Sequence, residues 1–259
     1  MKKIFLLLVI LGFCANFVFA QNVDEIINKA NLVSYYAGKD GKSKVKMIIT
    51  DSQGRKRNRE FKILRFNVKD GGEQKFYVYF EKPTDVARMT YMVWKNLGKD
   101  DDRWMYLPAL DLVRRIAASD KRSSFVGSHF VYEDVSGRGV DTDIHELLGE
   151  EDGFYKIKNT PKDDQGIEFS TYAVWIDKNN FMPMKAEYYN KAGDLIRTIE
   201  ALEVKDIDGH PTVFKSQATD FERGGQTVME FSDVQYDIGL DDNIFTERYL
   251  RKPPMQWFQ

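Results

Sequence analysis

The sequence predicts a mainly β protein with a few helices (α+β), built on one large antiparallel sheet of about 10–12 strands. Apolar and polar residues alternate along most of the chain after residue 42, which is typical of strands with two different faces. Short turns rich in glycine, aspartate and asparagine separate these segments, so neighbouring strands are expected to pair antiparallel. A sheet of this size is expected to curl rather than remain flat.

Residues 1–20 have the pattern of a secretory signal peptide. Lys2 stands in a short basic start, an apolar run follows, and small residues lead to Ala20, after which we expect cleavage. The run is shorter than the roughly 20 residues of a membrane span. Cys14 follows a phenylalanine where a lipid-anchor site needs a small residue, so we expect no anchor there. Residues 21–259 are therefore expected to form a single soluble domain, exported to the periplasm.

The composition of the exported chain excludes several classes of protein. It keeps 36 basic and 40 acidic side chains, a net charge of −4, whereas a nucleic-acid-binding protein needs a basic face. Loss of Cys14 with the signal peptide removes the only cysteine. Disulfides, thiol nucleophiles and cysteine metal sites are then excluded, and the apolar core alone must stabilise the domain.

The elements follow one another in a simple order. A helix is expected at residues 23–36, because apolar residues recur there at spacings of three and four and Asn22 is a suitable N-cap. Residues 117–150 break the alternation, and we expect a loop there with one or two helical turns at 143–148. Strands are expected at residues 43–50, 60–68, 74–80, 88–94, 103–108, 166–176, 183–189, 195–204, 212–220 and 227–234.

The segment D-D-R-W-M-Y-L-P-A-L-D-L-V-R-R-I, residues 101–116, has apolar residues on both faces of its strand. Trp104 and Tyr106 share one face, while Met105 and Leu107 share the other. Neither face is therefore expected to lie in water. One face can meet the covering helices while the other meets a ligand, or both can belong to an ordinary core.

Residues 121–134, K-R-S-S-F-V-G-S-H-F-V-Y-E-D, follow this segment. Together the two stretches resemble the bacterial outer-membrane lipoprotein-sorting family, relatives of the periplasmic lipoprotein carrier LolA. His129 departs from the family pattern, which usually has aspartate at that position. The residues that match are Trp104, Tyr106, Pro108, Arg115, Ile116, Ser124, Phe125, Gly127, Ser128, Phe130, Tyr132, Glu133 and Asp134.

The resemblance implies an incomplete β-barrel whose concave side is covered by helices and encloses an apolar cavity for acyl chains. For some relatives it also implies a partner, an envelope transporter of the resistance-nodulation-division (RND) type. Segment 123–128 is either a mobile flap that dips Phe125 into the cavity or a static loop. The candidate lining residues are Met89, Met92, Trp94, Trp104, Tyr106, Phe125, Phe130, Tyr132 and Trp175.

No motif indicates catalysis or metal binding. His129, His145 and His210 have no metal-ligand spacing, and the G-x-S-x-G elbow of serine hydrolases is absent from the sequence. The paired carboxylates stand in turn-rich segments without the spacing of a calcium loop. We therefore expect no enzyme activity, no metal and no cofactor.

Three functions remain as hypotheses. The first is a periplasmic carrier that binds lipid or lipoprotein acyl chains for outer-membrane sorting. The second is an accessory interaction protein of an RND-type transporter that carries no lipid itself, and the third, disfavoured one is an envelope hydrolase. We expect a monomer that binds no nucleic acid. The basic run at residues 55–59 is suited to transient contact with anionic lipid headgroups.

Overall fold

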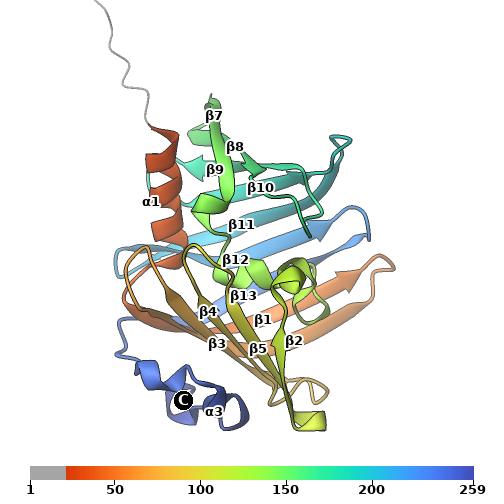
Figure 1. Ribbon diagram of the computed structural model, residues 1–259, viewed down its shortest axis with the longest axis vertical. Coiled ribbons are helices and arrows are strands. Elements are labelled where there is room, and N and C mark those ends of the chain that lie inside the picture. The colour runs from red at the N-terminus through yellow and green to blue at the C-terminus, as the bar shows by residue number, and fades with distance from the viewer. Residues whose placement is uncertain (1–21) are drawn as a thin grey trace, which may run out of the picture.

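The computed structural model describes residues 22–259, which begin with one helix, α1 (Val23–Tyr35) (Figure 1). The side chain of Asn22 caps this helix by accepting a hydrogen bond from Asp24 N at 3.1 Å. The predicted helix is thus confirmed. The signal peptide expected at residues 1–20, including Cys14, lies outside the described residues.

All the strands within residues 22–259 belong to a single antiparallel sheet of thirteen strands, in the order β6-β5-β4-β3-β2-β1-β13-β12-β11-β10-β9-β8-β7. Strands β1 and β13 pair in its middle, with Met47 opposite Met229, and join two meanders. The strands are β1 (Asp40–Asp51), β2 (Lys56–Asn67), β3 (Gln74–Lys82), β4 (Thr90–Lys95), β5 (Asp102–Leu107), β6 (Leu112–Ile116), β7 (Asp143–Glu151), β8 (Phe154–Pro161), β9 (Thr171–Asp177), β10 (Pro183–Tyr189), β11 (Leu195–Ile207), β12 (His210–Asp220) and β13 (Gly225–Tyr236).

The sheet is open, because its two outermost strands, β6 and β7, do not pair with each other. They are consecutive in the sequence, and residues 117–142 connect them. This bridging segment (residues 117–142) contains the short helix α2 (Tyr132–Ser136) and three 3-10 turns, at Ala118–Arg122, Phe125–Gly127 and Val140–Thr142. The gap between the sheet edges is therefore spanned by the segment that interrupts the strand pattern of the sequence.

The prediction of helical turns at residues 143–148 is wrong. This stretch is the start of edge strand β7, paired with β8 from Asp143–Pro161 onwards. The strand conformation brings Asp143, His145 and Leu147 to the same face, where Asp143 binds Arg138 and His145 contacts Asn159. A helix would separate these side chains, so tertiary contacts override the local apolar spacing.

The two faces of the sheet carry different clusters. On the inner face, an inner cluster forms on β1–β5, β12 and β13 and includes Val45, Met47, Ile49, Phe61, Phe76, Val78, Phe80, Met89, Tyr91, Val93, Met105, Phe125, Phe130, Ala218 and Met229. On the outer face, an outer cluster comprises Leu64, Tyr77, Met92, Trp104, Tyr106, Leu240, Ile244, Phe245, Leu250 and Phe258. The last five of these come from the C-terminal segment, which therefore covers the outer face of β2–β5.

The segment at 101–116 has the two buried faces expected from its sequence. Met105 lies in the inner cluster, whereas Trp104 and Tyr106 lie in the outer cluster beneath the C-terminal segment. That segment contains α3 (Glu247–Arg251) and two 3-10 turns, at Asp242–Ile244 and Met255–Trp257, and it lies at the bottom of Figure 1. A further 3-10 turn, Pro108–Leu110, ends β5.

The predicted fold class is confirmed as mainly β, with one antiparallel sheet that is not closed into a barrel. Within residues 22–259 the sheet has thirteen strands, and the three that the sequence analysis did not predict are β6, β7 and β8. The edge strands β6 and β7 lack a clear alternation in the sequence, whereas β8 alternates and was missed. Helices α1 and α2 lie on the inner face, but α3 lies on the outer face. Within residues 22–259, no helix has both the length and the apolar character needed to cross a membrane.

Candidate functional site

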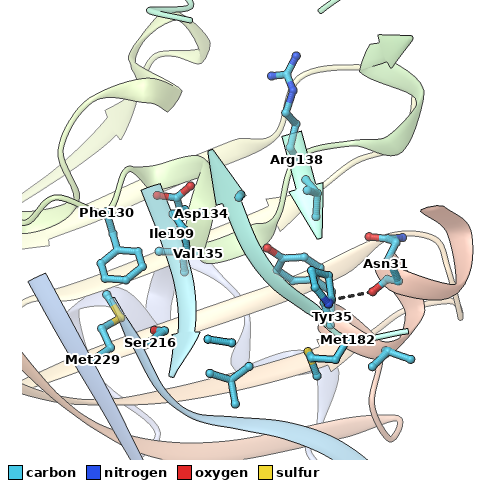
Figure 2. Close-up of a pocket in the computed structure, with 18 of the residues that line it drawn as sticks. Asn31, Tyr35, Phe130, Asp134, Val135, Arg138, Met182, Ile199, Ser216 and Met229 are labelled. Atoms are coloured by element: carbon cyan, nitrogen blue, oxygen red, sulfur yellow. Dashed lines mark hydrogen bonds between the residues drawn. The ribbon is translucent and has the colours of Figure 1, made fainter. Parts of the chain in front are cut away.

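The inner face of the sheet encloses a cavity of about 480 Å³. Residues from β1–β3, β7–β13, α1 and the bridging segment line it, and this is possible only because the sheet curls around it. Figure 2 shows part of the lining, with Asn31 and Tyr35 on α1, Phe130, Asp134 and Val135 on the bridging segment, and Ile199, Ser216 and Met229 on the strands. The volume lies within the range of small-molecule sites, about 300–1,000 Å³. Apolar lining residues include Phe130, Val135, Met182, Ile199, Met229 and Phe231.

Helix α1 covers the part of the cavity over β8 and β9. Ile26 and Ala30 are buried against Tyr155, Ile157 and Ile176, which project from the inner face of these strands. The C-terminal end of the helix is fixed by polar side chains. Arg65 Nη1 and Gln74 Nε2 donate to the carbonyl oxygen of Tyr35 at 2.9 and 2.6 Å. A cation at this end also compensates the helix dipole.

The bridging segment is anchored to the inner cluster by Phe125. Its ring packs against Phe61, Phe80, Tyr91 and Tyr132, with centroid distances between 5.5 and 6.1 Å. The side chain is 1% exposed. This aromatic anchor places the segment across the sheet, where it lines the cavity.

A network of buried ion pairs fixes α2 beside the cavity. Glu133 is 3.1 Å from Arg122 Nη1 and 3.3 Å from Arg138 Nη1, and Arg138 is 2.7 Å from Asp143 on edge strand β7. Arg122 also pairs with Glu168. Burial opposes their charge, but the neighbouring carboxylates hold the pKa of both Arg122 and Arg138 above the usual range. These guanidinium groups therefore stay charged and tie α2 to the sheet.

Asp134 extends the network to the middle of the sheet. Its Oδ2 accepts from the N–H of Val131 at 2.7 Å, which caps α2, and from Arg197 Nη2 on β11. Arg197 Nε also donates to the carbonyl oxygen of His129 at 3.3 Å. Glu133 and Asp134, the two carboxylates at the end of the sequence motif, are thus both bound by arginines from outside the motif.

Comparisons with known proteins agree with this architecture. A family model described only as that of an uncharacterized protein matches residues 72–252. The solved structure of a DUF1329 family protein from Desulfovibrio piger is similar, with 33% identity, a TM-score of 0.80, and 88% of this chain and 98% of that chain covered. An outer membrane lipoprotein-sorting protein domain from Vibrio parahaemolyticus has 26% identity and a TM-score of 0.80, covering 89% and 100%.

The chain belongs to the DUF1329 family, and it shares its fold with an outer membrane lipoprotein-sorting protein domain and with the LolA superfamily. A LolA superfamily protein from Nitrosomonas europaea shares the fold, with 20% identity, a TM-score of 0.68, and coverage of 89% and 100%. No curated protein sequence matches the chain. The resemblance expected from the central motif is therefore confirmed.

The structure places the predicted lining residues in three environments. Phe125 and Phe130 line the cavity. Met89 belongs to the inner cluster, and Tyr132 packs against it. The others lie on the outer face: Met92, Trp94, Trp104 and Tyr106 pack in or against the outer cluster, and Trp175 lies between Lys156 and Lys185, with Nζ-to-centroid distances of 4.6 and 5.2 Å.

Several lining residues were missed by the sequence reasoning. Ile199, Ser216 and Met229 lie on inner-face positions of β11, β12 and β13, and Tyr35 comes from α1. Alternation marks such positions as one face of a strand. Which face is the inner one depends on how the two meanders curl together, so strand pattern alone does not single them out.

His129, which replaces the aspartate of the family pattern, lies in a polar environment. Its N–H donates to Thr227 Oγ1 at 3.0 Å, and its Nδ1 lies 2.8 Å from the same oxygen. Burial, with a further contribution from Arg223, lowers the pKa of His129. His145 contacts Asn159 Oδ1 and the carbonyl oxygen of Val140. No group of three or more His, Cys, Asp or Glu side chains in residues 22–259 is arranged to hold a metal ion.

The basic run at residues 55–59 is partly compensated. Arg55 Nε lies 2.8 Å from Asp51, and Arg59, which is 8% exposed, lies 3.3 Å from Asp85. Transient contact of this hairpin with a membrane stays a prediction.

Proposed function

We propose that the protein is an envelope carrier that binds the acyl chains of a lipid or lipoprotein in the cavity on the inner face. Similarity to the lipoprotein-sorting domain from Vibrio parahaemolyticus supports a carrier role and a periplasmic location. The observation that carries the proposal is the cavity of about 480 Å³, lined largely by apolar side chains such as Phe130, Ile199 and Met229. Burial of an acyl chain stabilises a complex by about 0.8 kcal/mol per methylene, so binding here needs no catalytic group.

The cavity surroundings also favour carriage over chemistry. The carboxylates of Glu133 and Asp134, two of the acidic residues that line the cavity, are bound to arginines. A general acid or base must be within reach of a substrate proton, and these carboxylates are held in ion pairs that stabilise α2.

The test is native mass spectrometry of the protein purified gently from cells, followed by extraction and analysis of bound lipid. Ser216→Phe replaces a small lining side chain on β12 with a benzyl group that occupies the cavity. Gln217→Phe is the matched control, because the next residue along the strand points to the outer face. We expect near-stoichiometric acylated lipid on the wild type and on Gln217→Phe, and reduced occupancy on Ser216→Phe.

A clean apo mass for the wild type, together with no uptake of added lipid or lipopeptide, would overturn the carrier proposal. An accessory role on an RND-type envelope transporter would then be tested by affinity capture with the purified transporter.

A further inference from the structure

Two tyrosine side chains bring their hydroxyl groups to the cavity without a protein partner. Tyr35 on α1 and Tyr188 on β10 both line it, and within residues 22–259 neither hydroxyl takes part in a hydrogen bond. Tyr188 is only 8% exposed. A buried tyrosine usually finds a partner for its hydroxyl group, as Tyr172 does at 2.7 Å from Asp143 Oδ2.

Tyr35 is held close to α2. A Cβ atom added at Gly137, directly after α2, would lie 2.7 Å from Tyr35 Cζ. Lys95 Nζ lies 5.2 Å from the centroid of the Tyr35 ring. Burial, and then the nearby Asp134, Tyr188 and Glu133, raise the pKa of Tyr35, so its hydroxyl group is a neutral donor in the neighbourhood of these groups. Figure 2 shows Tyr35 and Asp134 on the cavity wall.

Tyr188 is fixed by neighbours on both sides of its strand. Its ring stacks on Tyr172 with centroids 5.1 Å apart. The guanidinium carbons of Arg197 and Arg122 lie 5.1 and 5.7 Å from its centroid. Burial raises the pKa of Tyr188 to about 12, so this hydroxyl group is also a neutral donor at physiological pH.

One acceptor accompanies these two donors. Both hydrogen bonds to the Asp134 carboxylate, from Val131 N and Arg197 Nη2, end on Oδ2. Asp134 lines the cavity, and its Oδ1 is left to accept a hydrogen bond. We call Tyr35, Tyr188 and Asp134 the tyrosine site.

Resting on the proposed carrier function, we infer that the tyrosine site holds an uncharged hydrogen-bonding group of the lipid, namely an ester or amide carbonyl with a hydroxyl or N–H group beside it. The carbonyl accepts from the tyrosines, and the hydroxyl or N–H donates to Asp134. This pattern is that of an acylglycerol or an N-acylated amine, and the acyl chain continues along the apolar lining.

An anionic head group does not fit this site. It would face the carboxylates of Asp134 and Glu133, while the nearby Arg122 and Arg138 are already bound to carboxylates. Arg197 Nη1 has no hydrogen-bond partner among the described residues, but the charge of this guanidinium is already balanced by Asp134 through Nη2. A buried charge without a free partner is costly. The site therefore selects a neutral lipid over a fatty acid of the same chain length.

The test is displacement of the apolar fluorescent reporter N-phenyl-1-naphthylamine from delipidated protein at pH 8. The competitors are mono-oleoylglycerol, oleate and a synthetic triacylated cysteinyl lipopeptide. We expect mono-oleoylglycerol to displace the reporter at about tenfold lower concentration than oleate, since two hydrogen bonds distinguish them. The double variant Tyr35→Phe/Tyr188→Phe is expected to lose this preference when each competitor concentration is referred to the variant's own affinity for the reporter. Tyr189→Phe is the control, because Tyr189 binds Glu187 on the outer face.

Loss of the preference in the double variant alone supports the tyrosine site. If the lipopeptide displaces the reporter from the wild type and does so less well from the double variant, the recognised group belongs to a lipoprotein. If only mono-oleoylglycerol behaves in this way, the group belongs to a free lipid. Equal competition by oleate, or an unchanged preference in the double variant, overturns the inference while leaving the carrier function standing. Failure of the wild type to bind the reporter and all three competitors overturns both.

Discussion

Substitution of Trp104 separates the two faces of the sheet experimentally. Trp104 is 7% exposed and packs edge-to-face on Trp94, with centroids 5.2 Å apart and an interplanar angle of 68°, in the outer cluster beneath the C-terminal segment. Trp104→Ala removes a large buried side chain, which costs about 3–5 kcal/mol of the free energy of unfolding. Since the free energy of unfolding of a domain is about 5–15 kcal/mol, the variant is expected to fold but to be much less stable than the wild type.

The assay combines urea unfolding with lipid analysis of the folded fraction. We expect Trp104→Ala to lower the unfolding midpoint but to keep its bound lipid, because Trp104 does not belong to the cavity lining. Phe130→Ala is the comparison, since Phe130 is 6% exposed and lines the cavity, and it is expected to lower both stability and occupancy. If folded Trp104→Ala were empty and as stable as the wild type, the assignment of the outer face to structural packing would be refuted.

Two further predictions concern the surroundings of α2. Gly137→Ala is expected to lower the free energy of unfolding by more than the roughly 1–3 kcal/mol that its backbone conformation costs, because the new Cβ meets the Tyr35 ring at 2.7 Å. Gly153→Ala is the control, since it has a similar φ and no atom within 4 Å of the new Cβ, so it measures the cost of a positive φ alone. Equal shifts of the melting temperature in the two variants would contradict the contact with Tyr35. The second prediction concerns Glu168. Burial raises the pKa of Glu168, but the hydrogen bond and charge of Arg122 outweigh burial and hold this pKa below its ordinary 4.5. This stabilisation is present above that value and is lost as the pH falls through the lower folded-state pKa, so Glu168→Gln should flatten the acid limb of the melting temperature against pH, and an unchanged slope would disprove the coupling.

The spacing of apolar residues and the capping residue predicted an element correctly wherever its own residues determine its conformation. Asn22 and the apolar spacing after it specify α1, and the alternation through residues 43–94 specifies the first strands, because period and capping are properties of neighbouring residues. Residues 143–148 show the opposite case. Their spacing suits a helical turn, and the pairing with β8 and the contact of Asp143 with Arg138 decide for a strand.

The sequence by itself determined that the chain forms a large antiparallel sheet with an N-terminal helix, that both faces of the 101–116 strand are buried, and that its central motif resembles that of the lipoprotein-sorting family. Only the tertiary structure decided which face meets the cavity. Trp104 and Phe130 are equally apolar in the sequence, yet the C-terminal segment covers the first and the cavity adjoins the second. The physical reason is that alternation fixes two faces per strand, whereas the inward side depends on the curl of the whole sheet and on segments distant in sequence that cover it.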